Sequence, residues 1–195
     1  MYRDLKTEVK TLLENYSLGY EIENEYRHIM LDFLEQDKDP FSRSNKNGHF
    51  TASAWLLSAD LLYVLLTKHA KIGKWFQLGG HIEKTDVSFL SACLREIREE
   101  SGIVLPKQSI ANSFVIDIDI HLIPQTDEMP EHPHYDITVC FVVERENSHV
   151  IRSKESLLLS WITLDKISTL SHDAALLRMV SKTKGLSVML RRSLQ

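Results

Sequence analysis

The sequence has little cysteine and no long apolar run. Its two cysteines, Cys93 and Cys140, each lie among apolar neighbours, which argues against a disulfide framework and predicts buried, reduced thiols. Nowhere are 18 consecutive residues apolar, and residues 1–10 are charged and lack the apolar segment of a secretory signal. These absences predict a cytoplasmic protein that does not span a membrane.

An excess of positive charge is also missing. Lysine and arginine together number 23 against 27 acidic residues, so the formal net charge is -4 and the pI is about 6.1. This balance gives no general affinity for nucleic acid or for an anionic membrane. We therefore expect a small-molecule partner, whose phosphates are held locally by cations or by a metal ion. The hydrophobic share of 43% is typical of one globular domain, with or without an appendage.

The first part of the chain has a helical pattern. Residues 2–36 contain two stretches whose apolar residues recur at helical spacing, and Gly19 marks the break between them. A polar connection over residues 36–48 leads into the rest of the chain. We expect a helical extension over residues 1–44 and a main domain over residues 45–195. The extension could add to the core, form a lid or mediate a homodimer.

The sequence pattern of the main domain predicts strands with helices packed on them. Short segments rich in β-branched and aromatic residues predict strands at 50–57, 61–67, 75–78, 114–122, 136–144 and 157–162. Helices are expected from about residue 88 to 101 and from about 174 to 182. Residues 123–133, with three prolines and several acidic residues, predict a long exposed loop. The fold class is therefore α/β, with a mixed sheet.

The helix expected near residues 88–101 carries an unusual acidic face. At about 100° per residue, Glu96, Glu99 and Glu100 lie on one face. Its apolar residues form a neighbouring stripe that can pack on the sheet: Leu90, Cys93, Leu94 and Ile97. Carboxylates spaced in this way repel one another by roughly 0.2–0.5 kcal/mol per pair, although glutamates and arginines on a helix usually form only a solvated face. A hard divalent cation would offset the repulsion, because Mg²⁺ prefers oxygen ligands.

The segment before and after this helix supports the same interpretation. Asp86 is a candidate N-cap and Gly102 a candidate C-terminal residue of the helix. The preceding pair, Gly79 and Gly80, permits close approach of the backbone to a metal ion or a phosphate. Five fixed letters in the spacing R-E-x-x-E-E-x-G arise by chance in such a chain on the order of 1 in 10,000 times. The pattern therefore predicts a functional site at this helix, for a metal ion or a phosphate.

This stretch resembles the Nudix box, G-x5-E-x7-R-E-U-x-E-E-x-G-U, in which U is a bulky aliphatic residue. The second half matches at every position from Arg95 to Ile103. The first half departs from the pattern, because Asp86 stands where the box has its first glutamate, and eight residues instead of seven separate it from Arg95. The loop GGHIEKTD, which includes Glu83, and the later HPHYD resemble a particular subgroup of Nudix-like hydrolases.

The resemblance implies a Nudix-like α/β/α sandwich and hydrolysis of a diphosphate linkage in a nucleoside diphosphate conjugate or related compound. It implies that Glu99 and Glu100 are ligands of Mg²⁺ or Mn²⁺ and that Glu96 is a further ligand or the base for the attacking water. Arg95 would orient the glutamates, and the carbonyl of Gly79 would complete the metal shell. The metal would polarise a phosphoryl oxygen.

Histidine is abundant, with nine residues, and five of them stand at suggestive positions. These five and one nearby carboxylate form a candidate second site for a metal such as Zn²⁺, or for phosphate: His49, His81, His121, His132, His134 and Asp136. A single histidine is more often structural or exposed than a ligand. The prediction therefore depends on whether the fold brings several of them together.

Two other functions are compatible with the sequence. Isopentenyl-diphosphate isomerase is similar in fold and places histidines much as His49 and His81 stand here, but it depends on a cysteine where this chain has Gly79. A non-catalytic module that binds a nucleotide is the other alternative, and the intact glutamates of the helix argue against it. Release of phosphate or monophosphate from nucleotide conjugates would separate a hydrolase from both.

Overall fold

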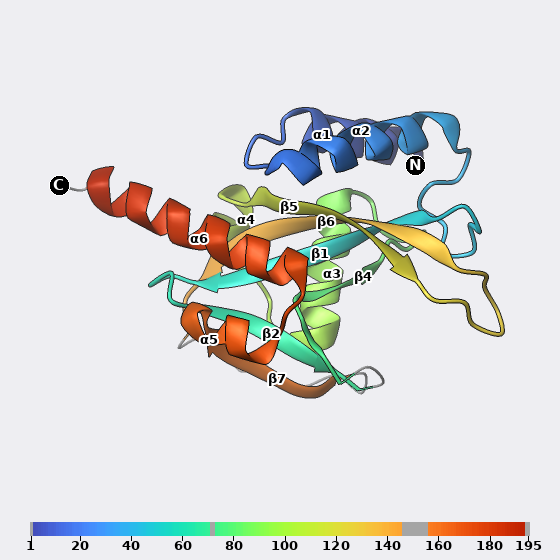
Figure 1. Cartoon of the computed structure of the whole chain (residues 1–195). Coiled ribbons are helices and arrows are strands. Elements are labelled where there is room, and N and C mark those ends of the chain that lie inside the picture. The colour runs from blue at the N-terminus through green and yellow to red at the C-terminus, as the bar shows by residue number, and fades with distance from the viewer. Residues whose placement is uncertain (1, 71–72, 146–155, 194–195) are drawn as a thin grey trace.

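A mixed β-sheet forms the centre of the molecule (Figure 1). The computed structural model describes residues 2–70, 73–145 and 156–193. Within these residues the sheet has seven strands: β1 (His49–Ser58), β2 (Tyr63–His69), β3 (Trp75–Phe76), β4 (Leu78–His81), β5 (Phe114–Ile123), β6 (His132–Val143) and β7 (Ser156–Thr163). The order is β3-β2-β1-β6-β5, with β4 paired to β1 and β7 to β2. Strands β1 and β6 are parallel, and the other pairs are antiparallel.

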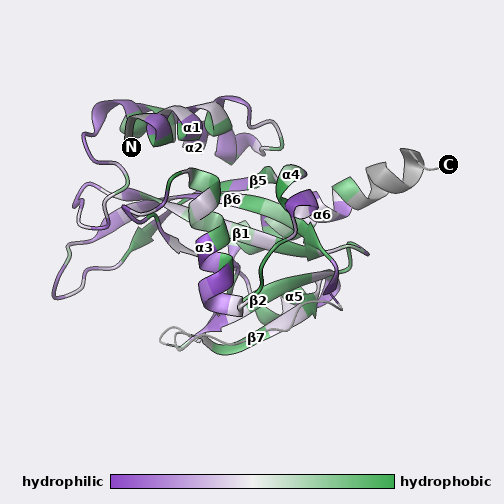
Figure 2. Ribbon diagram, turned by 180° about the vertical axis from the view of Figure 1, so that it is seen from behind, coloured by the Kyte–Doolittle hydropathy of each residue, from purple (hydrophilic) through white to green (hydrophobic). Residues whose placement is uncertain are grey.

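Helices cover both faces of this sheet. They are α1 (Tyr2–Glu14), α2 (Glu21–Gln36), α3 (Phe89–Ser101), α4 (Lys107–Ala111), α5 (Leu164–Leu170) and α6 (Ala174–Ser193). Helix α3 lies behind the strands in Figure 1 and in front of them in Figure 2, whereas α6 lies on the opposite side. The expected α/β/α sandwich with a mixed sheet is confirmed. No helix in the described ranges has the length and apolarity needed to cross a membrane.

Successive side chains of a strand point to opposite faces of the sheet, so the strands contribute to two separate cores. In β1, Ala54 and Leu56 face a core shared with α1, α2 and α3, whereas Trp55 and Leu57 face a second core with α5 and α6. All ten residues of β1 are buried, because helices cover both sides of the strand. The sheet therefore holds α3 rigidly against one face, and α3 is the helix with the acidic side chains.

The predicted elements differ from the observed ones at several points. The segment expected as one strand near residues 75–78 is divided into β3 and β4, and Gly79 and Gly80 belong to β4. Strand β6 begins at His132, four residues earlier than expected, because its pairing with β5 continues to Ile123. Helices α4 and α5 were not predicted; both are short. Residues 124–128 are exposed, as expected for the proline-rich loop. Both cysteines are buried and unpaired, as predicted.

A buried ionic network joins the N-terminal helices to the sheet and to α6. The ammonium group of Lys182 donates to Glu23 at 2.6 Å and to Asp117 at 2.6 Å, and also to the hydroxyl of Tyr16 at 2.7 Å. Arg178 donates to both carboxylate oxygens of Asp117 at 3.0 and 2.6 Å. Burial raises the pKa of Glu23, but the hydrogen bonds from Lys182 and Tyr16 outweigh this and hold that pKa below its usual value.

Candidate active site

Helix α3 begins and ends with well-formed caps. The hydroxyl of Ser88 accepts from the amide of Ser91 at 3.0 Å, and the hydroxyl of Ser91 accepts from the amide of Ser88 at 2.9 Å. The N-cap is therefore Ser88, and the prediction that Asp86 caps the helix was wrong. At the other end, Gly102 adopts the left-handed conformation with φ 72°, as expected of a glycine there. A carboxylate from α1, that of Glu8, also accepts from the amide of Phe89 at 2.7 Å.

Arg95 organises the carboxylates around it. Its Nη1 donates to Glu96 at 2.8 Å and to Glu99 at 3.1 Å. Its Nε and Nη2 hold the two carboxylate oxygens of Asp86 at 3.1 and 2.9 Å, and Nη2 also donates to the carbonyl of His81 at 2.8 Å. The extra residue before Arg95 thus leaves Asp86 as an ion-pair partner of the arginine.

This set of bonds keeps the guanidinium charged. Burial lowers the pKa of Arg95, but the hydrogen bonds to Asp86 and Glu96 outweigh it and raise that pKa further above its usual value. One cation therefore stands among three carboxylates. The excess of negative charge that remains is what a further cation would offset.

The glycine pair of β4 lies directly against two of the glutamates. The amide of Gly79 donates to Glu100 at 2.8 Å. A Cβ added to Gly80 would lie 2.7 Å from Oε1 of Glu96, so a larger residue would force this carboxylate to shift. Burial raises the pKa of Glu96, and the hydrogen bond from Arg95 opposes that rise. The groups that lie close to the glycine pair are thus carboxylates of α3, and approach of a metal ion or phosphate to this backbone stays a prediction.

A cavity of about 630 Å³ opens beside these groups. Its walls include the glycine pair, Arg95 and the three glutamates, so the acidic side chains of α3 are not closed off by their contacts with the arginine. Figure 2 shows that the C-terminal half of α3, which carries these acidic side chains, is hydrophilic. Phe41, Ser42 and Arg43 form another wall, although the sequence marked their segment only as a connection. The positive charge of Arg43 beside turn-forming residues was the one signal available there.

Gly79 is expected to tolerate no side chain. Its φ is +147°, and an added Cβ would lie 2.6 Å from the Cα of Ser53 on the paired strand β1. We expect Gly79→Ala to lower the free energy of unfolding by about 2–4 kcal/mol, through backbone strain together with overpacking. Gly73→Ala is the matched control, because Gly73 also has a positive φ but nothing lies within 4 Å of its added Cβ. Its expected cost is about 1–2 kcal/mol. Equal losses in urea denaturation would contradict the steric argument.

Histidines from neighbouring strands converge beside this cavity. The parallel pairing of β1 with β6 aligns His49 with His134, and the antiparallel pairing of β5 with β6 aligns His121 with His134. The ring centroids of His49 and His134 lie 4.5 Å apart, and that of His81 lies 5.0 Å from His49. His132 lies two residues before His134, on the same face of β6. The five predicted histidines are therefore brought together.

The remaining member of the predicted second site, Asp136, has a different environment. Its carboxylate accepts from the hydroxyls of Thr51 at 2.6 Å, Ser53 at 2.8 Å and Thr138 at 3.2 Å. Burial raises its pKa. Polar residues at alternate positions of β1 were the sequence signal for these hydroxyl donors, and it was missed. Asp136 is thus bonded to hydroxyl groups of its own and neighbouring strands.

Comparison with known proteins shows which family has a similar sequence and fold. The NUDIX domain model matches residues 47–182. Among solved structures, the MutT protein from Methanosarcina mazei Go1 has a TM-score of 0.51 at 22% identity, covering 72% of this chain and 95% of its own. A NUDIX-family hydrolase from Clostridium perfringens has a TM-score of 0.49 at 22% identity, covering 73% and 99%. A C. elegans Ap4A hydrolase in a binary complex has a TM-score of 0.49 at 16% identity, covering 73% and 97%.

No curated protein matches the sequence. At 22% identity the Methanosarcina mazei structure indicates a shared fold alone, whereas the domain match over most of the chain establishes the family. The chain therefore belongs to the Nudix family and is a hydrolase of the type that cleaves diphosphate linkages.

Proposed function

We propose that this chain hydrolyses the diphosphate linkage of a nucleoside diphosphate conjugate or related small molecule, with Mg²⁺ or Mn²⁺ held by the glutamates of α3. One observation supports this above all others. Glu96, Glu99 and Glu100 lie at the glycine pair of β4, on the wall of the 630 Å³ cavity. The motifs GGHIEKTD and HPHYD place the chain, in this proposal, in a distinct subgroup of the family.

The donors present suit a hard divalent cation. Such ions take carboxylate and carbonyl oxygens as ligands, and the carboxylates of Glu99 and Glu100 with the carbonyl of Gly79 supply them in this proposal. Gly80 leaves space for the carboxylate of Glu96, which an added Cβ would meet at 2.7 Å. When bound, the cation would supply Lewis-acid polarisation of a phosphoryl oxygen and neutralise negative charge on the phosphates.

The chain's own residues position the acidic groups and handle the proton. Arg95 holds Glu96 and Glu99 through one nitrogen, which fixes their side chains relative to each other. Glu96 serves as a further ligand or as the base that takes a proton from the attacking water. Its burial raises its pKa, which strengthens it as a base.

The N-terminal segment is assigned a supporting role. We propose that residues 1–44 form a helical extension of a catalytic domain over residues 45–195. Glu8 of α1 accepts from the first amides of α3, at 2.7 Å from Phe89 and 3.4 Å from Leu90. A carboxylate at this end also interacts favourably with the helix dipole. The extension thereby stabilises the helix that carries the glutamates.

A panel of phosphate compounds tests the proposed function. The full chain is incubated with Mg²⁺ and with dinucleoside polyphosphates, nucleotide sugars, nucleoside triphosphates, coenzyme A and isopentenyl diphosphate, and the products are separated by chromatography. We expect a nucleoside or pantetheine monophosphate from at least one compound. Chelation with EDTA should abolish its release, and excess Mg²⁺ should restore it. Isomerised isopentenyl diphosphate, or binding of a compound without cleavage, would instead support one of the two alternatives.

A further inference from the structure

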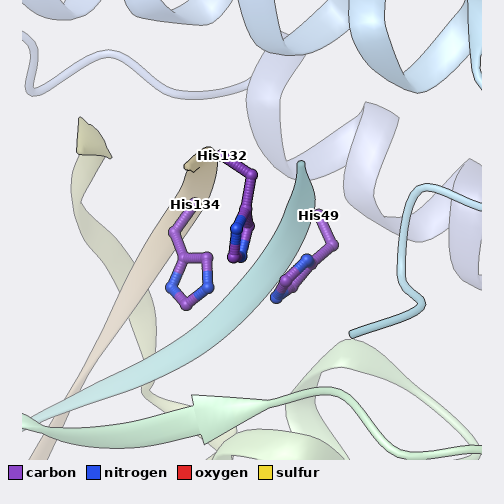
Figure 3. A group of neighbouring side chains, drawn as sticks. All are labelled: His49, His132 and His134. Carbon is purple, nitrogen blue, oxygen red and sulfur yellow. The ribbon is translucent and has the colours of Figure 1, made fainter. Parts of the chain in front are cut away.

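A group of three histidines lies at one end of β1 and β6, on strands and not on the helix that carries the glutamates. Figure 3 shows the imidazoles of His49, His132 and His134 turned toward a common space. One ring nitrogen from each lies within 4.8 Å of the other two. In a tetrahedral Zn²⁺ site with bonds of about 2.0–2.1 Å, ligand atoms stand roughly 3.4 Å apart. Small rotations of the three rings would therefore close the group around an ion.

The environment of His49 needs an explanation. It is 0% exposed, and among the residues that the structure describes neither ring nitrogen has a hydrogen-bond partner in normal geometry. A buried polar group without a partner is unfavourable, since the interaction it made with water has been lost. A metal ion bonded to one nitrogen would compensate for that loss. If His49 served only to fill space in the core, both of its ring nitrogens would remain without a partner.

The second histidine is already oriented for a ligand role. Nδ1 of His132 lies 2.8 Å from the carbonyl oxygen of Pro130, which can only accept. Nδ1 of this ring therefore carries a proton, which in the neutral ring leaves Nε2 as the nitrogen that can bind a metal ion. A carbonyl that fixes the tautomer of a histidine is a common supporting contact in metal sites.

Two of the three rings, those of His49 and His134, lie in surroundings that disfavour a positive charge. Burial and the nearby rings lower the pKa of His49 to about 4 and that of His134 to about 2. His134 is only half-buried and lines a cavity of about 390 Å³, through which an ion could enter.

From these observations we infer that His49, His132 and His134 form a binding site for a divalent transition metal ion such as Zn²⁺, separate from the glutamate site. Three imidazoles suit Zn²⁺ far better than Mg²⁺, which prefers oxygen. Three protein ligands leave a fourth position open, as in metal sites that bind a water molecule or a substrate oxygen. The cavity that His134 lines also borders Gly79, Gly80 and Glu100 of the glutamate site.

Spectroscopy of the protein with Co²⁺ and Zn²⁺ tests this inference without reference to activity. The full chain is stripped with a chelator, dialysed and titrated with Co²⁺, whose visible absorption is intense in a tetrahedral nitrogen site and weak among carboxylates and water. We expect the intense absorption to reach its maximum at one equivalent of Co²⁺ per chain. One equivalent of Zn²⁺ should displace this Co²⁺. Zn²⁺ should also raise the unfolding temperature. Lack of an intense Co²⁺ spectrum together with lack of stoichiometric Zn²⁺ binding would overturn the inference.

Variants assign the ligands. His134→Ala and His132→Gln should each weaken Zn²⁺ binding by about 100-fold or more, because second-shell changes alone cost about 10–100-fold. His28→Ala, at an exposed position of α2, should bind Zn²⁺ within twofold of the original chain. Circular dichroism establishes that each variant is folded, and two independent ligand variants are used so that loss of folding in one leaves the other decisive. Unchanged Zn²⁺ affinity in a folded ligand variant would contradict the assignment.

The glutamate site supplies the remaining control. Glu99→Gln should retain the intense Co²⁺ spectrum and the Zn²⁺ affinity, because Glu99 is not among the three ligands. If Glu99→Gln abolished them, the bound ion would lie at the glutamates and the inference would be wrong. Mg²⁺-dependent hydrolysis is measured separately, so failure of the histidine site leaves the proposed function standing, and the reverse also holds.

Discussion

Replacing Glu99 with glutamine is expected to lower Mg²⁺-dependent turnover by about 100-fold or more, on the scale of losing one electrostatic contact to a transition state. The side chain of Glu99 is 57% exposed, and Arg95 is the partner that contacts it, at 3.1 Å. Glutamine has the same shape and still accepts this hydrogen bond through its carbonyl oxygen. Only the negative charge is lost. The free energy of unfolding should therefore stay within about 0.5 kcal/mol, as for most surface changes.

Steady-state kinetics at several Mg²⁺ concentrations measures this effect. If Glu99 is a ligand, saturation should require more Mg²⁺ in the variant, and turnover should remain low at saturation. Glu35→Gln is a matched control, because Glu35 on α2 is 79% exposed and lies only 3.8 Å from Lys10. Its turnover should equal that of the original chain. Turnover near the original value in Glu99→Gln would remove the assignment of the glutamate site.

Replacing Lys182 with methionine is expected to lower the free energy of unfolding by about 3–5 kcal/mol, the usual cost of removing one partner of a buried ion pair. The change leaves the carboxylates of Glu23 and Asp117 buried, with Arg178 as their remaining ion-pair partner among the described residues. Methionine fills a similar volume, so little of the loss comes from packing. For a chain of this length, each kcal/mol shifts the unfolding temperature by roughly 2–4 °C.

Lys184→Met, on the same helix, separates the effect of burial from the effect of charge. Lys184 pairs with Asp165 at 2.6 Å, but its side chain is 50% exposed and that of its partner is 87% exposed. Exposed pairs contribute about 0–1 kcal/mol. Urea denaturation followed by circular dichroism compares the two variants. Similar stability losses in both would show that the buried network does not hold the N-terminal helices to α6 and the sheet.

The acidic helix was predictable because its information is local. Helical periodicity over one stretch of sequence placed Glu96, Glu99 and Glu100 on a common face, and the observed helix ends within a residue or two of the expected one. The N-cap was the error at its start, since Ser88 and Ser91 bond reciprocally and leave Asp86 to Arg95. Spacing alone does not distinguish a cap from an ion-pair partner a short distance before the helix.

The histidines were predicted as candidates, but their convergence was not predictable from local pattern. His49 and His134 are far apart in the sequence and become neighbours because β1 and β6 pair in parallel, in one register. A shift of one residue in that register would turn a strand's side chains to the opposite face. Register is decided by the packing of both cores against the helices, and no local motif encodes it.

By itself, the sequence determined the mixed α/β character, the amphipathic helix and the residues able to carry the chemistry, because periodicity and motif spacing act over a few turns of chain. Tertiary structure alone decided which of these residues meet. Elements distant in sequence had to pack before Lys182 could neutralise Glu23 and Asp117, and α3 had to pack beside β4 before Gly79 could contact Glu100. Such contacts depend on long-range burial, where removal of water makes charges and hydrogen bonds matter most.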